Sequence, residues 1–297
     1  MKLLLYNDHR LGVLKDGLVY DAMSAMRGMR FASASDRMRA LIARWEEFKP
    51  LVEEAVSRNK GVPVASVTVR PPIPHPTKII CAAVNYLEFG QRSPADLEAF
   101  IKSSEAVIGN GDTVVLPPCK ATIFHHEAEL GLVIGKDATD VTQRDAMKYV
   151  FGYLNFVDVS ARGLAPGGRV SFFLGKSWDT FAPMGPVIVT ADEVPDPHNL
   201  RVRMWCNGQP RHDFNTSDMA HKIPELIEFM SGVTTLRAGD IISTGTNHQG
   251  IGPVQDGNVV EMEIDGLERL VFNVRDPLKR SWPHSIDYAM AKSVIQR

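Results

Sequence analysis

The sequence predicts an α+β fold, made mainly of β-strands and preceded by a small N-terminal α/β domain. Two observations carry this prediction: strand-like apolar segments outnumber helical patterns after about residue 75, and four prolines fall within residues 70–76. Because proline cannot continue a helix and restricts the residue before it, this proline-rich segment must be extended. We therefore place a domain boundary there, with residues 1–70 as the small domain and 71–297 as the main domain.

The N-terminal domain is expected to combine short strands with helix. Residues 3–6, 11–14 and 18–20 are mostly apolar and are separated by turn residues, as in a series of hairpins. From Ser35 to Phe48, apolar residues recur three or four positions apart, which predicts an amphipathic helix. Pro50 is expected to interrupt or bend this helix before a second short helical stretch.

Strands dominate the pattern of the main domain. Strands are expected at 78–83, 127–134, 152–159, 187–189, 201–205, 240–243 and 259–264, and helices at 94–103 and 224–230. This mixture is typical of an α+β or β-roll architecture rather than of a doubly wound parallel sheet.

Composition and charge favour a soluble, small-molecule enzyme. The chain has 297 residues and a formal net charge of −2, so neither a nucleic acid nor an anionic membrane is indicated as a partner. Three widely spaced cysteines form no disulfide framework and indicate a reducing compartment. The first residues lack a signal-peptide core, and no apolar run approaches the roughly 20 residues that span a bilayer. The expected location is the cytoplasm.

The first chemical signal is a pair of glutamates in an apolar strand. Alternate residues of a strand share a face, so Glu127 and Glu129 lie side by side, while the apolar residues that alternate with them point the other way. Two carboxylates roughly 7 Å apart repel each other unless a positive group or solvent separates them. A solvated edge strand is the alternative interpretation, but two glycines and a strongly apolar character indicate a covered strand.

A third carboxylate, Asp158, stands in a second apolar segment and needs a partner if it is buried. Three oxygen donors suit a hard cation such as Mg²⁺ or Mn²⁺. Zinc is less favoured because an HExxH motif is absent and the His-x-Glu string lacks a PCxxC partner. His125 and His126, just before the glutamates, are expected to support the site rather than bind the metal.

Two further segments carry candidate groups. Lys176 stands between a glycine and a serine, and a lysine near carboxylates can bind an anionic substrate or polarise a carbonyl. An isolated lysine is nevertheless usually a surface residue. Residues 239–253 form a strand that runs into a Gly/Thr-rich loop, which can present N–H groups and a hydroxyl to a carboxylate. An ordinary glycine-rich turn explains that loop equally well.

Taken in order, these segments resemble the fumarylacetoacetate hydrolase family. The family's HHExEL strand, Asp-to-Arg strand, Gly-Lys-Ser segment and TGT loop ending in Gly-Pro correspond to residues 125–130, 158–162, 175–177 and 240–253. The resemblance covers about residues 75–277. It implies a mixed β-roll or β-sandwich with helices at its edges, usually assembled as a homodimer.

The resemblance also implies roles for particular residues. Glu127, Glu129 and Asp158 match the family's ligands for Mg²⁺ or Mn²⁺, and Lys176 matches its active-site lysine. The matching positions also make four further residues candidates for substrate binding. One of them, Thr246, corresponds to the family's threonine that helps hold the substrate carboxylate. The four are Tyr86, Arg162, Gly245 and Thr246.

Two departures from the family pattern concern the acid–base residues. Many members that hydrolyse acylpyruvates carry NYxxHxxE on a mobile lid, where its His and Glu activate water. Here Phe89 and Arg92 stand at those two positions of the lid, about residues 87–110. The TGTP loop becomes TGTNHQ, which makes His248 a candidate replacement because imidazole titrates near neutral pH. His221 and Glu88 are further candidates.

The shared chemistry implied by the resemblance is chelation of a small 2-oxo acid by the metal, which acts as a Lewis acid with help from Lys176. Hydrolysis of a C–C bond in a β-diketo acid, as in aromatic catabolism, is the first expectation. The missing lid residues favour decarboxylation, isomerisation or dehydration as alternatives. A non-catalytic binding protein is a further alternative, whereas no serine-hydrolase elbow or nucleotide-binding loop is present.

Overall fold

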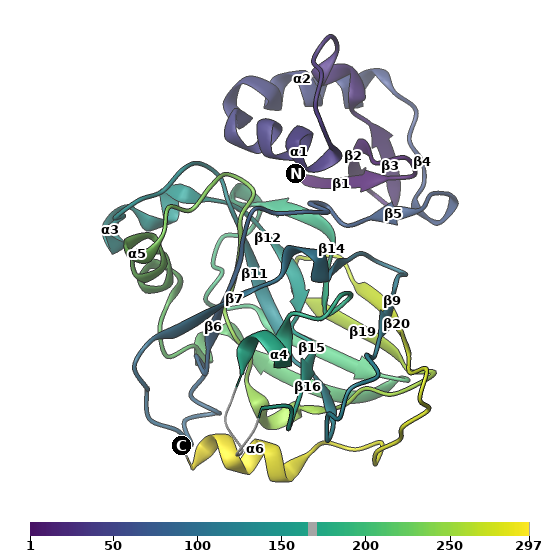
Figure 1. Cartoon of the computed structure of the whole chain (residues 1–297). Coiled ribbons are helices and arrows are strands. Elements are labelled where there is room, and N and C mark those ends of the chain that lie inside the picture. The colour runs from purple at the N-terminus through teal and green to yellow at the C-terminus, as the bar shows by residue number, and fades with distance from the viewer. Residues whose placement is uncertain (166–170, 297) are drawn as a thin grey trace.

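The computed structural model describes residues 1–165 and 171–296, which are arranged around one large mixed sheet and two smaller ones (Figure 1). The strands of the large sheet are, in spatial order, β4 (Val62–Pro63), β3 (Leu18–Asp21), β2 (Arg10–Lys15), β1 (Lys2–Tyr6), β14 (Ala182–Thr190), β12 (Val150–Val157), β11 (Ala128–Ile134), β17 (Ile241–Ser243), β6 (Ile79–Ala83) and β7 (Glu98–Lys102). Beside this path, β5 (Val69–Arg70) pairs with β1, and β8 (Val107–Ile108) pairs with β14.

The two smaller sheets flank the large one. The five-stranded sheet runs β16 (Gln209–Asn215), β15 (Arg201–Cys206), β19 (Val259–Ile264), β20 (Leu270–Arg275) and β9 (Thr113–Val115). The three-stranded sheet runs β13 (Ser160–Ala161), β10 (Phe124–His126) and β18 (Gly252–Pro253).

Helices lie at the edges of these sheets. The α-helices are α1 (Ala34–Ala43), α2 (Trp45–Arg58), α3 (Gln143–Ala146), α4 (Phe172–Lys176), α5 (Ile223–Val233) and α6 (Tyr288–Ile295). The 3₁₀ turns are η1 (Met23–Met26), η2 (Val64–Ser66), η3 (Ser104–Ala106), η4 (Met147–Tyr149), η6 (Ala191–Glu193), η7 (Thr216–Asp218) and η8 (His248–Gly250). None of the helices in the described ranges combines the length and the apolar character needed to cross a membrane.

The pairing pattern confirms the predicted α+β, mainly β fold. Most neighbouring strands are antiparallel, and parallel pairing is restricted to β17–β6, β14–β8 and β20–β9 among the described strands. A doubly wound fold would instead place helical crossovers on both faces of a parallel sheet.

The N-terminal region extends the large sheet. Figure 1 shows it at the top, with α1 and α2 beside a short antiparallel group of strands. Its first strand, β1, pairs with β14 of the main region, so Leu3 lies opposite Ile188. An ion pair of 2.6 Å between Lys2 and Glu268 adds a second connection. The domain boundary at residue 70 stays a prediction. The β1–β14 pairing and the Lys2–Glu268 ion pair connect the regions on either side of it.

The helix expected around Pro50 is interrupted at a different residue. Arg44 leaves the helical conformation, with φ −121° and ψ 35°, and separates α1 from α2. Pro50 lies inside α2, where it removes one backbone hydrogen bond. The buried face formed by Phe48, Val52 and Ala55 holds the helix against the strands despite that loss.

The helix expected at 94–103 is wrong, because this segment contains β7. It pairs antiparallel with β6, so Phe100 lies opposite Cys81 and the backbone groups find partners on a neighbouring strand. Tertiary pairing thus overrides the local pattern. Since alternate strand residues share a face, Phe100 and Lys102 point to one side, while Ile101, 60% exposed, points to the other. The helix expected at 224–230 is confirmed as part of α5.

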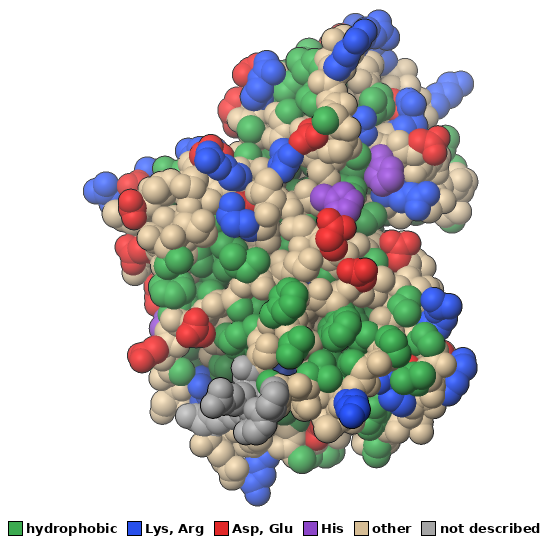
Figure 2. Space-filling model, viewed as in Figure 1, with side chains coloured by type: hydrophobic (Ala, Val, Ile, Leu, Met, Phe, Trp, Pro, Cys, Tyr) green, Lys and Arg blue, Asp and Glu red, His purple; other side chains and the backbone are tan. Residues whose placement is uncertain are grey.

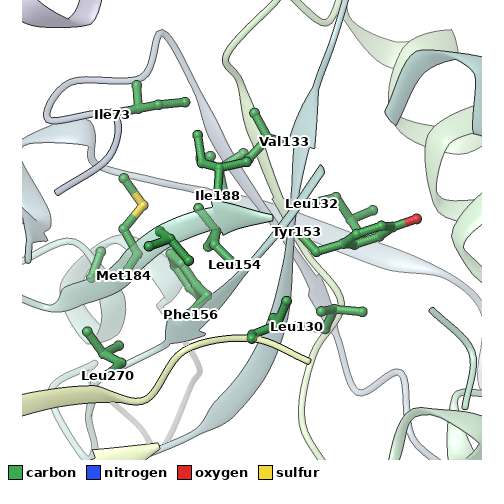
Figure 3. Packing of buried hydrophobic residues seen from close by; sticks show 14 of the residues in the cluster. Ile73, Leu130, Leu132, Val133, Tyr153, Leu154, Phe156, Met184, Ile188 and Leu270 are labelled. Atoms are coloured by element: carbon green, nitrogen blue, oxygen red, sulfur yellow. The ribbon is translucent and has the colours of Figure 1, made fainter. Parts of the chain in front are cut away.

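The central strands β11 and β12 are buried along their whole lengths. Apolar side chains cover both faces of this pair: Leu154 and Phe156 pack on one face, and Leu132 and Tyr153 on the other (Figure 3). Strand β11 is therefore a covered central element, as its glycines and apolar residues predicted. The start of β11 and the end of β12 pair with each other at the place where the acidic residues stand.

Candidate active site

The three carboxylates predicted to bind metal lie together. Glu127 stands between β10 and β11, Glu129 is in β11, and Asp158 follows β12. Pairing of β11 with β12 aligns them, and the Asp158 N–H donates to the Glu127 carbonyl at 3.0 Å. Each side chain offers one oxygen within 4.8 Å of the others, and all three are buried. Distant segments thus converge on one buried acidic cluster.

Cationic side chains surround this cluster. Lys176 Nζ, at the end of α4, lies 2.6 Å from Glu127 Oε2 and 2.5 Å from Asp158 Oδ2. Lys102, fully buried, pairs with the other oxygen of Asp158 and donates to the Val159 carbonyl at 3.2 Å. Arg162 pairs with the second oxygen of Glu127. Sequence reasoning identified Lys176 and Arg162 but missed Lys102.

The two glutamates have opposite electrostatic environments. Burial raises the pKa of Glu127, but the nearby Lys176 and Arg162 outweigh it and hold this pKa well below its usual range. For Glu129, burial and repulsion by Asp158 and Glu127 raise the pKa well above its usual range. Its contacts are the Ser243 hydroxyl and the Gly245 N–H, at 3.2 Å for the latter. Glu129 is thus the carboxylate without an ion-pair partner among the described residues.

This donor set fits a divalent metal ion. Buried carboxylate oxygens are the ligands that Mg²⁺ and Mn²⁺ prefer. A divalent ion would also neutralise Glu129, whose charge is otherwise opposed by its two neighbours. The chemistry of the site therefore agrees with the predicted metal, and Glu127, Glu129 and Asp158 are the residues that would hold it.

An imidazole–carboxylate pair borders the same site. His248, which begins η8, places Nδ1 2.8 Å from Glu88 Oε1. The second oxygen of Glu88 accepts from the His248 N–H at 2.9 Å and from the Gln249 amide at 2.8 Å. Glu88 is fully buried and begins a left-handed turn, with φ 53°. The two residues were separate candidates in the sequence, and the structure joins them.

The three carboxylates, Lys176, Arg162 and His248 line one small cavity of about 160 Å³. Its polar lining consists of the three carboxylates, two cations, the TGT loop and His248, and its apolar lining comes from several elements. The lining residues are Ala82, Ala83, Val84, Phe100, Glu127, Glu129, Asp158, Arg162, Phe172, Lys176, Gly245, Thr246, His248, Met290 and Val294.

The TGT loop contributes both shape and hydrogen bonds. Gly245 has φ 81°, and a Cβ at this position would come within 3.2 Å of the Ala82 carbonyl oxygen, so the turn requires glycine. Its N–H holds Glu129, while Thr246 faces the cavity and donates its hydroxyl to the Asn247 carbonyl at 3.3 Å. The loop therefore orients a carboxylate of the cluster as well as forming part of the cavity wall.

Two candidates lie away from the cavity lining. The Tyr86 ring is fully buried, edge-to-face with Phe214 at 5.0 Å between ring centroids. Its part in substrate binding stays a prediction. His221 contacts Glu225 at 3.0 Å and the Ala95 carbonyl at 2.7 Å, so both ring nitrogens have partners outside the cavity.

The two histidines before Glu127 occupy supporting positions. His125 Nε2 lies 3.0 Å from Asp287 Oδ2, and its Nδ1 accepts from Arg162 Nε at 3.2 Å. His126 Nδ1 lies 3.2 Å from His212 Nε2. These contacts agree with the supporting role expected for the two histidines.

Several residues in or beside the cavity carried no recognisable signal in the sequence. Phe100 and Lys102 fall in the segment that was expected to be helical, and alternation within β7 was the available clue. Phe172, Met290 and Val294 are apolar residues of short helices, and such residues are ordinarily core residues. Only the pairing of distant segments brings them to the site.

Comparison with known proteins agrees with this geometry. Residues 78–275 match the fumarylacetoacetate (FAA) hydrolase C-terminal family. The chain is 38% identical over 221 residues to an oxaloacetate tautomerase of Bacillus subtilis, covering 70% of this chain and 73% of that protein.

Solved structures are similar over nearly the whole chain. One is maleylpyruvate hydrolase from Sphingobium sp. SYK-6 in complex with manganese(II) ion and pyruvate, with a TM-score of 0.83, 37% identity and coverage of 93% of this chain and 99% of that chain. Another is 5-carboxymethyl-2-hydroxymuconate delta-isomerase from Mycobacterium smegmatis, with a TM-score of 0.73, 29% identity and the same coverage. Since the matched region includes the whole acidic cluster and Lys176, the chain belongs to the fumarylacetoacetate hydrolase family.

Proposed function

We propose that this protein is a divalent-metal-dependent hydrolase that cleaves a C–C bond in a small 2-oxo acid of the acylpyruvate type. The observation that carries the proposal is the buried Glu88–His248 pair beside the three carboxylates. It offers the acid–base function that the lid positions Phe89 and Arg92 lack. A Mg²⁺ or Mn²⁺ ion held by the carboxylates would supply Lewis-acid stabilisation of the charge that develops on the 2-keto oxygen.

The cationic side chains would position the acid and share its charge. Lys176 is held at the cavity by Glu127 and Asp158, and these carboxylates raise its pKa although burial alone lowers it. It therefore stays protonated and can stabilise an oxyanion of the substrate. Thr246, on the cavity wall, offers a hydroxyl for the substrate carboxylate.

The Glu88–His248 pair would move the proton. Glu88 accepts from Nδ1–H, which fixes the tautomer and leaves Nε2 as a base. His248 removes a proton from water, and the hydroxide adds to the carbonyl farther from the carboxylate. The bond between the two acyl parts then breaks with its electrons on the pyruvate carbon. His248 returns the proton to that carbon, so the products are a carboxylic acid and pyruvate.

A second candidate is keto–enol tautomerisation of a 2-oxo acid such as oxaloacetate. The same histidine would then carry a proton between carbon and oxygen without water attack. The similarity to the oxaloacetate tautomerase favours this reading. The maleylpyruvate hydrolase supports hydrolysis over a larger part of the chain, 93% against 70%.

The deciding experiment measures turnover of a substrate panel with Mg²⁺, Mn²⁺ or EDTA. Acylpyruvates, fumarylpyruvate and oxaloacetate are followed by absorbance, and the products are identified by mass. We expect metal-dependent release of pyruvate from an acylpyruvate, and its loss in Glu129→Ala. Enol–keto conversion without bond cleavage would establish the tautomerase instead. Tight metal binding with no reaction of any acid would indicate a non-catalytic binding protein.

We further propose a homodimer. Figure 2 shows hydrophobic side chains gathered on the face that carries α4, where Phe173 is 74% exposed, and the adjacent strand β7 exposes Ile101. Burial of such a surface is a common basis for self-association. Sedimentation equilibrium should give twice the 32.8 kDa chain mass. A cytoplasmic location and a place in aromatic catabolism are part of the same proposal, the former supported by three free cysteines.

A further inference from the structure

The C-terminal helix α6 reaches the site from outside the family-matched region. That region ends at residue 275, whereas α6 spans residues 288–295 (Figure 1, yellow). Met290 and Val294 nevertheless line the same cavity as the three carboxylates. Residues four positions apart occupy one face of a helix, so α6 presents a continuous apolar face to the cavity.

The position of α6 is fixed by Asp287 at its first turn. One oxygen of Asp287 caps the helix by accepting from the Met290 N–H at 3.0 Å, and the other lies 3.0 Å from His125 Nε2. The Asp287 N–H donates to the Ile251 carbonyl at 2.8 Å, immediately after the turn that carries His248. His125 in turn contacts Arg162, which pairs with Glu127. A chain of polar contacts thus links α6 to the acidic cluster.

The residues that complete this wall are aromatic. The Phe100 and Phe172 rings are stacked, with centroids 4.4 Å apart and an angle of 2° between their planes. Lys176 Nζ lies 5.4 Å from the Phe100 centroid, so this wall begins where the charged part of the site ends. The two cations of the cavity lining, Lys176 and Arg162, both already pair with carboxylates.

We propose that α6 determines substrate specificity by contacting the group that the 2-oxo acid carries at its far end, and that it selects an uncharged hydrocarbon group. The inference rests on the proposed function for the placement of the 2-oxo acid itself. Met290 and Val294, with the stacked rings, can bury methylene groups. Among the described residues, the lining offers no cation that is not already paired, so a second carboxylate in that position would lose its hydration against hydrocarbon.

The test measures binding rather than turnover. The Mg²⁺-loaded protein is titrated calorimetrically with pyruvate, 2-oxobutanoate, 2-oxohexanoate and 2-oxoglutarate. For the unaltered protein we expect affinity to rise by about fourfold for each buried methylene, and 2-oxoglutarate to bind more weakly than 2-oxohexanoate. In Met290→Ala the gain for 2-oxohexanoate over pyruvate should fall at least about tenfold, while pyruvate affinity changes less than about twofold.

Two variants serve as matched controls. Met290→Leu keeps the apolar volume and should keep the gradient of affinity with chain length. Lys292→Gln changes an exposed residue of the same helix and should behave like the unaltered protein. Unchanged circular dichroism and melting temperature show that Met290→Ala is folded.

The outcomes separate this inference from the proposed hydrolysis. An affinity gradient that depends on Met290, without cleavage of any acylpyruvate, supports the role of α6 and overturns the hydrolase. Cleavage with the same gradient in Met290→Ala, or with 2-oxoglutarate bound as tightly as 2-oxohexanoate, overturns the role of α6 and leaves the hydrolase standing. Failure of all four acids to bind overturns both.

Discussion

His248 Nδ1 lies 2.8 Å from Glu88 Oε1, although the two residues are 160 positions apart in the sequence. The pair is preorganised, because the same carboxylate also accepts from the His248 N–H and from the Gln249 side chain. An imidazole held this way keeps one ring nitrogen free to face the cavity. This contact joins the segment after Tyr86 to the TGT loop, and it is the pair proposed above to move the proton.

Breaking this pair should remove the chemistry and leave metal binding intact. In Glu88→Gln an amide replaces an oxygen that accepts hydrogen bonds, and in His248→Ala the base itself is lost. We expect kcat to fall by roughly 10²–10⁴-fold in both, the usual contribution of general acid–base catalysis, with metal affinity nearly unchanged. Stopped-flow assays and metal titration measure the two quantities. Phe89→Ala, at a neighbouring side chain that is 53% exposed, is the control. Normal turnover in His248→Ala would assign the proton transfer to another residue.

Lys102 should contribute more to the stability of the metal-free protein than to that of the metal-bound protein. It is fully buried and pairs with Asp158, so Lys102→Met leaves one buried carboxylate oxygen of Asp158 without a hydrogen-bond donor among the described residues. Breaking a buried ion pair costs about 3–5 kcal/mol, and the lower end is expected because Lys176 still pairs with the other oxygen. Urea denaturation in EDTA should show this loss, and saturating Mn²⁺ should recover most of it. Equal losses with and without Mn²⁺ would place Lys102 outside the electrostatics of the metal site.

We expect Glu129 to lower the stability of the metal-free protein and to be required for tight metal binding. Burial and two neighbouring carboxylates oppose its charge, so Glu129→Gln removes an unfavourable interaction from the metal-free protein. We expect metal-free stability to rise by on the order of 1 kcal/mol, and affinity for Mn²⁺ to fall by more than the roughly 10–100-fold typical of supporting residues. Calorimetry and melting curves in EDTA give both values. The converse result, a less stable variant that binds Mn²⁺ normally, would exclude Glu129 as a ligand.

The acidic cluster could be predicted because its signals are local. Glu127 and Glu129 alternate within one apolar strand, and a buried carboxylate such as Asp158 needs a partner wherever it stands. The fold class followed from the same strand patterns. In contrast, the segment around Phe100 and Lys102 was expected to be helical, because its pairing with β6 is decided by a neighbouring strand rather than by its own residues.

Residues that reach the site from distant parts of the chain could not be recognised from local sequence patterns. Met290 is one apolar residue of a short helix, and the contacts of Asp287 with His125 and with the Ile251 carbonyl bring that helix to the cavity. The pairing of Glu88 with His248 likewise depends on a left-handed turn at residues 88–90. Such relationships are set by the register of the whole fold, so a single sequence indicates the candidates but not their partnership.

Acid should destabilise the protein through a buried histidine. His212 is buried between the Asn247 carbonyl and His126, at 3.1 and 3.2 Å, and burial lowers its pKa to about 4 from the ordinary 6.5. Between these values the unfolded chain binds a proton that the folded chain does not. The stability that depends on neutral His212 is therefore fully present above pH 6.5 and is lost as the pH falls toward 4. A pKa difference of this size corresponds to about 3 kcal/mol.

His212→Gln keeps a polar side chain that can donate to the Asn247 carbonyl, but it does not titrate. We expect urea denaturation in EDTA to show a smaller loss of stability between pH 6.5 and 4 for this variant than for the unaltered protein. Carboxylates titrate in the same range in both proteins, so the difference between the two curves isolates the histidine. His75→Gln, at a side chain that is 62% exposed, should reproduce the unaltered curve. If the His212→Gln curve has the same slope, the acid sensitivity arises from other groups, such as the carboxylates or the buried His125 and His126, and not from this imidazole.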